Sequence, residues 1–154
     1  MQQLQNASDL DVCAGAVLEA VLEVMVTLRE KTARGVKGLT LIQTRALGVL
    51  RKRPGSSLSW LSAQLALTIS ATSRLVDSLV EKKLIKRTVP AGNRRSVSLH
   101  LTAAGMKLLE EKMQFARREL AQPLASLSPR ERAQLTASMK QLHDLLLAAA
   151  RLPD

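Results

Sequence analysis

Aromatic residues are nearly absent from this sequence. Its 154 residues include one tryptophan, one phenylalanine and no tyrosine. The core must therefore be built from Leu, Val, Ala, Ile and Met, which are side chains that suit the packing of helices against one another. We predict a mainly α-helical fold with little β-structure.

Cysteine is also scarce. The single Cys13 excludes an internal disulfide and a zinc site with several cysteine ligands. It leaves a free thiol or an intermolecular bridge. The plain interpretation is a thiol that is buried among the apolar neighbours of a helix.

Long apolar segments are missing as well. No run of about 18 apolar residues occurs, and residues 1–11 lack the basic start and apolar centre of a signal peptide. We therefore expect a cytoplasmic protein without a membrane partner.

Acidic residues are outnumbered. The sequence holds 23 Lys and Arg against 13 Asp and Glu, which gives a formal net charge of +10. Such a surface attracts polyanions whatever its fold. DNA, RNA and acidic lipid all fit this charge, but no single helix combines a basic face with bulky aromatic residues, so a membrane surface ranks last.

The residue clusters that catalysis requires are not visible. We find no cysteine with a nearby histidine, no paired carboxylates and no phosphate-binding glycine loop, and His100 and His143 lie far apart in the sequence. We predict a protein that is not an enzyme and that has no cofactor and no metal site.

Two helices are expected in the first third of the chain. Apolar residues recur at helical spacing from Leu10 to Leu28, in a stripe so wide that a second subunit would be needed to cover it. Thr40 to Arg51 predicts a second helix, which Pro54 and Gly55 end.

Two further helices follow closely and predict a helix-turn-helix. The first spans Ser59 to Ala66, with Ser56, Ser57 or Ser59 as its cap. Thr68 caps the second. The second helix is expected to bury Thr72, Leu75, Val76 and Leu79 and to turn Ser70, Ser73, Arg74, Asp77 and Ser78 outward.

A change to alternating polar and apolar residues then predicts a β-hairpin. Its strands are Leu84 to Thr88 and Ser96 to Leu101, and Pro90 to Arg95 form the loop between them. Six basic residues and no carboxylate lie between Lys82 and Arg95. The hairpin is therefore a basic wing that is suited to neutralising phosphates.

Two helices complete the sequence. Thr102 caps one that runs toward Pro123, and the capping box of Ser128 and Glu131, with Pro129 as the first helical residue, opens the last.

The order of these elements is specific enough to identify a resemblance. Residues 61–87, LSAQLALTISATSRLVDSLVEKKLIKR, and residues 93–105, NRRSVSLHLTAAG, resemble the MarR family of winged helix-turn-helix regulators. The resemblance implies one MarR-like domain over 1–154, with dimerisation helices at 8–34 and 103–151 and a DNA-binding region at 40–101.

The resemblance further implies a function. We expect a homodimeric, sequence-specific regulator of transcription that binds a pseudo-palindromic double-stranded operator, usually as a repressor that responds to a small aromatic or lipophilic effector. No effector-binding residues can be named. The residues expected at the DNA are Thr68, Ser70, Ser73, Arg74, Lys86, Arg87, Asn93, Arg94 and Arg95.

Three positions depart from the family pattern. Asn93 stands where the family typically has an aspartate that pairs with the wing arginine. Ala66 and Lys83 stand where it often has glycine, so a left-handed backbone at either residue would cost on the order of 1 kcal/mol.

Two alternatives remain open. One is a nonspecific architectural DNA-binding protein, which the high charge and the altered wing motif would suit. The other is a redox-sensing repressor that uses Cys13, because hydroperoxide sensors of this family carry a cysteine in their first helix. Those sensors rely on supporting tyrosines, and this chain has no tyrosine.

Overall fold

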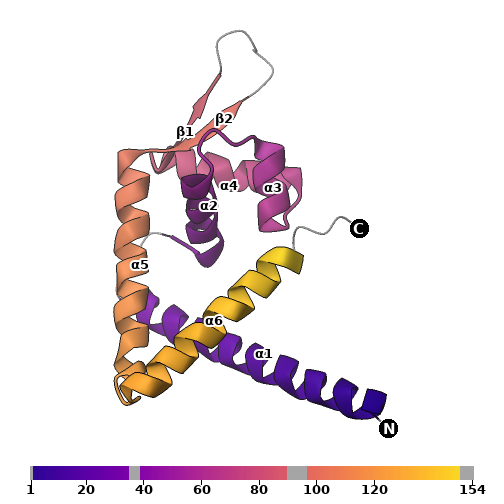
Figure 1. Cartoon of the computed structure of the whole chain (residues 1–154). Coiled ribbons are helices and arrows are strands. Elements are labelled where there is room, and N and C mark those ends of the chain that lie inside the picture. Colours follow the sequence, from indigo (N-terminus) through magenta and orange to yellow (C-terminus); the bar gives the residue numbers. More distant parts are fainter. Residues whose placement is uncertain (1, 35–38, 90–96, 150–154) are drawn as a thin grey trace. The chain divides into compact units, whose positions relative to one another are not determined.

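The computed structural model describes residues 2–34, 39–89 and 97–149. Six helices and two strands lie in these ranges (Figure 1): α1 (Gln2–Arg34), α2 (Leu41–Lys52), α3 (Leu58–Leu65), α4 (Ile69–Glu81), β1 (Ile85–Thr88), β2 (Ser98–Leu101), α5 (Ala103–Leu124) and α6 (Pro129–Ala149). The chain divides into two compact units, Met1–Ala116 and Arg117–Asp154, which are described separately. The predicted mainly helical winged helix-turn-helix is confirmed.

Side-chain caps define where α2 and α3 begin. The Thr40 hydroxyl accepts a hydrogen bond from the Gln43 main-chain N–H, and the Gln43 amide oxygen accepts one from the Thr40 N–H. Among the three candidate serines, Ser57 caps α3, since its hydroxyl accepts from the Trp60 N–H at 3.2 Å. Both caps satisfy main-chain donors that a helix start leaves unpaired.

The helix-turn-helix is formed by α3 and α4. Ala66 ends α3 in the left-handed conformation, and Thr68 caps α4 by accepting from the Ala71 N–H. Thr72 is fully buried even though it is polar, because its hydroxyl donates to the Thr68 main-chain oxygen at 2.9 Å. This local bond lets a threonine occupy the apolar face of α4.

Two residues of the predicted outward face of α4, Ser73 and Ser78, are half-buried. The Ser78 hydroxyl accepts a 3.3 Å hydrogen bond from the Gln43 side-chain amide. Leu75, expected in the core, is also only half-buried. The cause at Ser78 is a polar contact between α2 and α4 that helical periodicity does not predict.

The hairpin is antiparallel, and its register pairs Ile85 with Leu101 and Arg87 with Leu99. The main chain of Ser56 forms a further bridge to Leu99. Both strands are shorter than predicted. Leu84 precedes β1, because its N–H bonds to the Leu79 oxygen at the end of α4 instead of joining the sheet.

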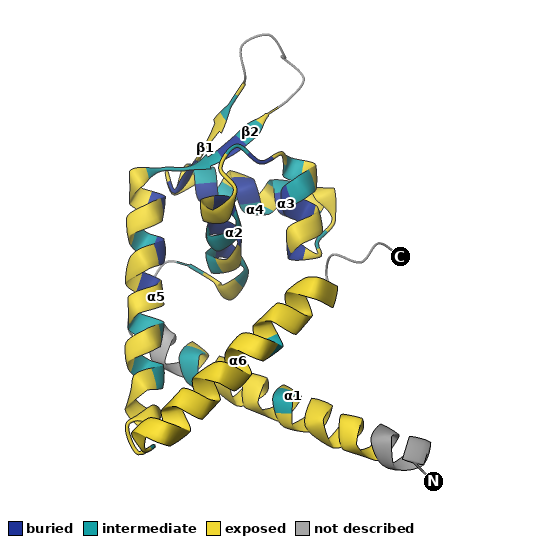
Figure 2. Ribbon diagram, viewed as in Figure 1, coloured by how far each residue is buried: buried dark blue, intermediate teal, exposed yellow. Residues whose placement is uncertain are grey.

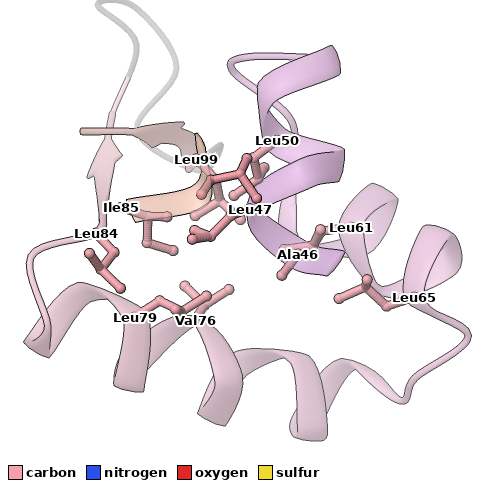
Figure 3. Packing of buried hydrophobic residues seen from close by; sticks show 11 residues of the cluster. Ala46, Leu47, Leu50, Leu61, Leu65, Val76, Leu79, Leu84, Ile85 and Leu99 are labelled. Atoms are coloured by element: carbon pink, nitrogen blue, oxygen red, sulfur yellow. The ribbon is translucent and has the colours of Figure 1, made fainter. Parts of the chain in front are cut away.

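The core of the first unit lies between α2, α3, α4 and the hairpin (Figure 3). It consists of aliphatic side chains that are less than about one-tenth exposed: Ala46, Leu47, Leu50, Leu61, Leu65, Val76, Leu79, Leu84, Ile85, Leu99 and Leu109. Burial of this apolar surface is the main stabilising contribution and holds α4 in a fixed place against the sheet.

The start of α5 is fixed against the end of α4. Thr102 caps α5, since its hydroxyl accepts from the Gly105 N–H at 3.0 Å and also lies 2.7 Å from the Lys83 oxygen. A Cβ at Gly105 would overlap the Leu84 carbonyl oxygen. Glycine at this position therefore permits the close approach of the two main chains.

The first helix keeps much of its apolar surface exposed (Figure 2). Leu10 is 72% exposed and Leu22 is 52% exposed. Cys13 is exposed as well, so its expected burial is wrong for this chain. The helical stripe was correctly identified, and most of it is exposed, although Val17 and Leu28 are half-buried.

The second unit contains the end of α5 and helix α6. The predicted capping box is confirmed, because the Ser128 N–H donates to the Glu131 carboxylate at 2.8 Å and the Glu131 N–H donates to the Ser128 hydroxyl. These bonds lower the pKa of Glu131. No described residue of α6 is buried.

Candidate nucleic-acid interface

The N-terminal half of α4 presents short polar side chains and one arginine. Ser70 and Arg74 are exposed, and Ser73 between them is half-buried. Thr68 is exposed too, but its hydroxyl already accepts the capping bond from Ala71. Small side chains at this end of a helix allow its main chain to approach a DNA groove closely. Arg74 is then the long side chain that can reach the base edges.

An ion pair joins this helix to the wing. The Arg87 guanidinium on β1 lies 2.6 Å from the Asp77 carboxylate on α4, and both side chains are partly exposed. Asp77 was expected to face outward, and it does, but its pairing with Arg87 was not anticipated. The partners lie 10 residues apart on different elements, and neither periodicity nor a motif predicts such a contact.

The two basic residues expected on β1 point in different directions. Arg87 is opposite Leu99, on the hairpin face that Ile85 and Leu99 bury against the core. Lys86 is opposite His100, on the other face, because successive side chains of a strand alternate. The structure therefore associates Arg87 with α4 and places Lys86 on the opposite face of the hairpin.

The remaining predicted wing contacts are Asn93, Arg94 and Arg95. They lie outside the described residues.

Contacts of polar side chains connect α2 to α4 and to α3. Gln43 joins the cap of α2 to Ser78 of α4, and the Arg45 guanidinium donates to the Gln64 carbonyl near the end of α3. A further contact places the Arg53 guanidinium 4.8 Å from the centre of the Trp60 ring. Sequence reasoning missed all three, because each joins residues from different segments.

Both departures from glycine have structural consequences. Ala66 has φ of 53° and Lys83 has φ of 56°, so both adopt the left-handed conformation. A left-handed backbone at a residue with a Cβ costs on the order of 1 kcal/mol, so the chain is strained just before and just after α4.

In the ranges that the structure describes, no cluster of His, Cys, Asp and Glu is arranged to bind a metal, and no helix is long and apolar enough to cross a membrane.

Comparison with known proteins places this geometry in a family. Residues 37–96 match the sequence profile of the MarR family. The chain is 28% identical over 140 residues to the HTH-type transcriptional repressor MdtR of Bacillus subtilis, an alignment that covers 89% of this chain and 87% of MdtR.

Solved structures agree with that match. The crystal structure of RV1404 from Mycobacterium tuberculosis superposes with a TM-score of 0.79 at 28% identity and covers 94% of this chain and 96% of RV1404. The transcriptional repressor CouR, solved on a 23-mer DNA duplex, gives a TM-score of 0.66 at 25% identity and covers 84% of this chain and 89% of CouR. A transcriptional regulatory protein for the hcr operon of Thauera aromatica is 30% identical over 118 residues, which cover 77% of this chain and 67% of that protein. The chain belongs to the MarR family of transcription regulators.

Proposed function

We propose that the protein binds double-stranded DNA in a sequence-specific manner and represses transcription as a homodimer. The observation that carries the proposal is that Ser70 and Arg74 are exposed, with the half-buried Ser73 between them, on a helix whose opposite face is fixed in the core. A recognition helix needs such a rigid support, because base readout depends on placing a few side chains accurately. The repressor name of MdtR and the DNA-bound state of CouR support it.

Exposed apolar surface supports the homodimer. On α1, Leu10, Leu18 and Leu22 are each more than half exposed, and on α6 the same holds for Leu145 and Leu146. Soluble proteins rarely leave such stripes uncovered. We infer that 8–34 and 103–151 form the dimer interface and that 40–101 form the DNA-binding region. Deletion of residues 1–30 should then yield aggregated or unfolded chain, and a well-behaved monomer would contradict the interface.

The proposal includes release from DNA by a small aromatic or lipophilic effector. Its support is the family membership alone, and no effector-binding residue is assigned. Titration of a panel of aromatic acids into a protein–DNA complex, followed by fluorescence anisotropy, tests it. Since its target is genomic DNA, we place the protein in the cytoplasm.

The primary test is selection of bound sequences from a random duplex pool at physiological salt. A dimer should enrich an inverted repeat whose half-sites are about one helical turn apart. Tight, salt-sensitive binding without enrichment would instead support a nonspecific architectural protein.

The Cys13→Ser variant tests the redox alternative. If peroxide releases DNA from this variant as it does from the wild type, Cys13 has no sensing role.

A further inference from the structure

A carboxylate lies on the helix face that is proposed to meet DNA. Asp77 follows Ser73 by four residues and Arg74 by three, so all three share one side of α4. A negative charge there repels phosphates unless a cation compensates it. The Arg87 guanidinium, 2.6 Å away, supplies that cation.

The ion pair also restricts the arginine. The guanidinium has five N–H donors, and Asp77 accepts through one oxygen from the terminal nitrogen Nη2. The side chain remains 40% exposed, so other donors stay accessible. A free arginine loses rotamer entropy when it binds phosphate, and one that is already held loses less.

The position of the pair determines what Arg87 can reach. The β1 register turns Arg87 toward α4, while its neighbour Lys86 points to the opposite face. Arg87 therefore lies where the recognition helix meets the first strand of the wing. A duplex that accepts α4 in its major groove passes a phosphate strand at this junction before the wing reaches the adjacent groove.

We propose that Asp77 is a positioning residue for DNA binding, which holds the Arg87 guanidinium against a backbone phosphate at the junction of α4 and β1. This inference rests on the proposed function. It adds that removal of the Asp77 carboxylate weakens binding to DNA, although DNA is a polyanion. Simple charge counting predicts the opposite sign, because Asp77→Asn makes the protein more positive.

The test measures operator affinity as a function of salt for single and double variants. Asp77→Asn should weaken binding by about three- to tenfold, the range expected when a restrained side chain becomes mobile. Arg87→Gln should weaken it at least as much and lower the steepness of the logarithmic salt dependence by about one phosphate contact. The double variant should match Arg87→Gln, because Asp77 acts only through Arg87.

Two controls separate positioning from other effects. Glu81→Gln removes the same charge one turn further along α4 and should leave affinity unchanged or slightly higher. Asp77→Glu retains a charged carboxylate to pair with Arg87 and should recover most of the affinity. Thermal unfolding should change little in every variant, because an exposed ion pair contributes little to stability.

Each outcome has a distinct meaning. If Asp77→Asn binds as tightly as the wild type or more tightly, the carboxylate only opposes DNA and the inference is wrong. An equal loss in the Arg87→Gln background would also overturn it, since the effect would not pass through Arg87. If the wild type shows no sequence-selective binding, the proposed function fails and this inference fails with it.

Discussion

The ammonium group of Lys112 on α5 donates a 2.7 Å hydrogen bond to the main-chain oxygen of Leu39, the residue before the cap of α2. Lys112 is only 8% exposed. From Leu39 the contacts continue through the Thr40 and Gln43 capping box to Ser78 on α4. A continuous set of polar contacts therefore joins α5, proposed to carry the dimer interface, to α4, the proposed recognition helix.

Because Lys112 is buried, the free energy of unfolding should vary with pH in the alkaline range. Desolvation, followed by repulsion from Lys82, lowers the pKa of Lys112 below its ordinary value of 10.5. At pH values between the lowered pKa and 10.5, Lys112 binds more protons in the unfolded chain than in the folded protein. The contribution of Lys112 to the free energy of unfolding therefore rises with pH in this window, and it is lost as the pH falls through the folded pKa. The chain has no tyrosine, so fewer other side chains titrate in this pH range.

Denaturant unfolding of the wild type and of Lys112→Met, at pH 7 and above 10.5, tests this dependence. The free energy of unfolding of the wild type, relative to the variant, should increase at the higher pH. A difference that stays constant or decreases would show that the folded protein does not penalise the charged form.

Gly105 provides a steric test of the junction between α4 and α5. A Cβ at this position would overlap the Leu84 carbonyl oxygen, and a main-chain atom cannot move aside as a flexible side chain can. Gly105→Ala should therefore destabilise the protein by about 1–3 kcal/mol or more. Chemical denaturation measures this loss.

Gly48 offers the matched control. It lies inside α2, and a Cβ there would meet nothing within 4 Å. Gly48→Ala should stabilise by about 0.5–1 kcal/mol, the usual advantage of alanine in a helix. If both variants shift stability in the same direction, the close approach at Gly105 does not determine the result.

The two left-handed residues predict stabilising substitutions. Ala66 and Lys83 both carry positive φ, a conformation that glycine adopts without the steric cost of a Cβ. Ala66→Gly and Lys83→Gly should each raise the free energy of unfolding by about 1 kcal/mol or less, because glycine also gains entropy in the unfolded chain. Ala63→Gly, within α3, should lower it by about 1 kcal/mol. Destabilisation by all three would indicate that the strain at 66 and 83 is negligible.

The fold could be predicted largely because its signals are local. Thr40, Thr68 and Ser128 cap helices by bonds that span three residues, and a capping motif is visible in the sequence. The left-handed positions were also accessible, since Ala66 and Lys83 stand where the family often has glycine.

The candidate site was less predictable because its contacts are not local. Arg87 was assigned to a contact with DNA, and the fold in addition pairs it with Asp77. Lys112 follows Leu109 on the buried stripe of α5, and this spacing could have signalled its burial, but its acceptor Leu39 lies 73 residues away. Such pairs are fixed by tertiary packing, which no local pattern encodes.

Arg74 is the last residue for which the structure supports a specific outcome. It is exposed on α4 between the small serines and Asp77, so it can reach base edges as well as phosphates. Arg74→Ala should weaken operator binding by about 1–3 kcal/mol and relax the preference at one position of each half-site. Arg130→Ala removes an exposed arginine from the first turn of α6 and should leave both quantities nearly unchanged. The sequence selection is repeated with both variants. If the wild type and Arg74→Ala enrich the same repeat equally, Arg74 does not take part in base readout.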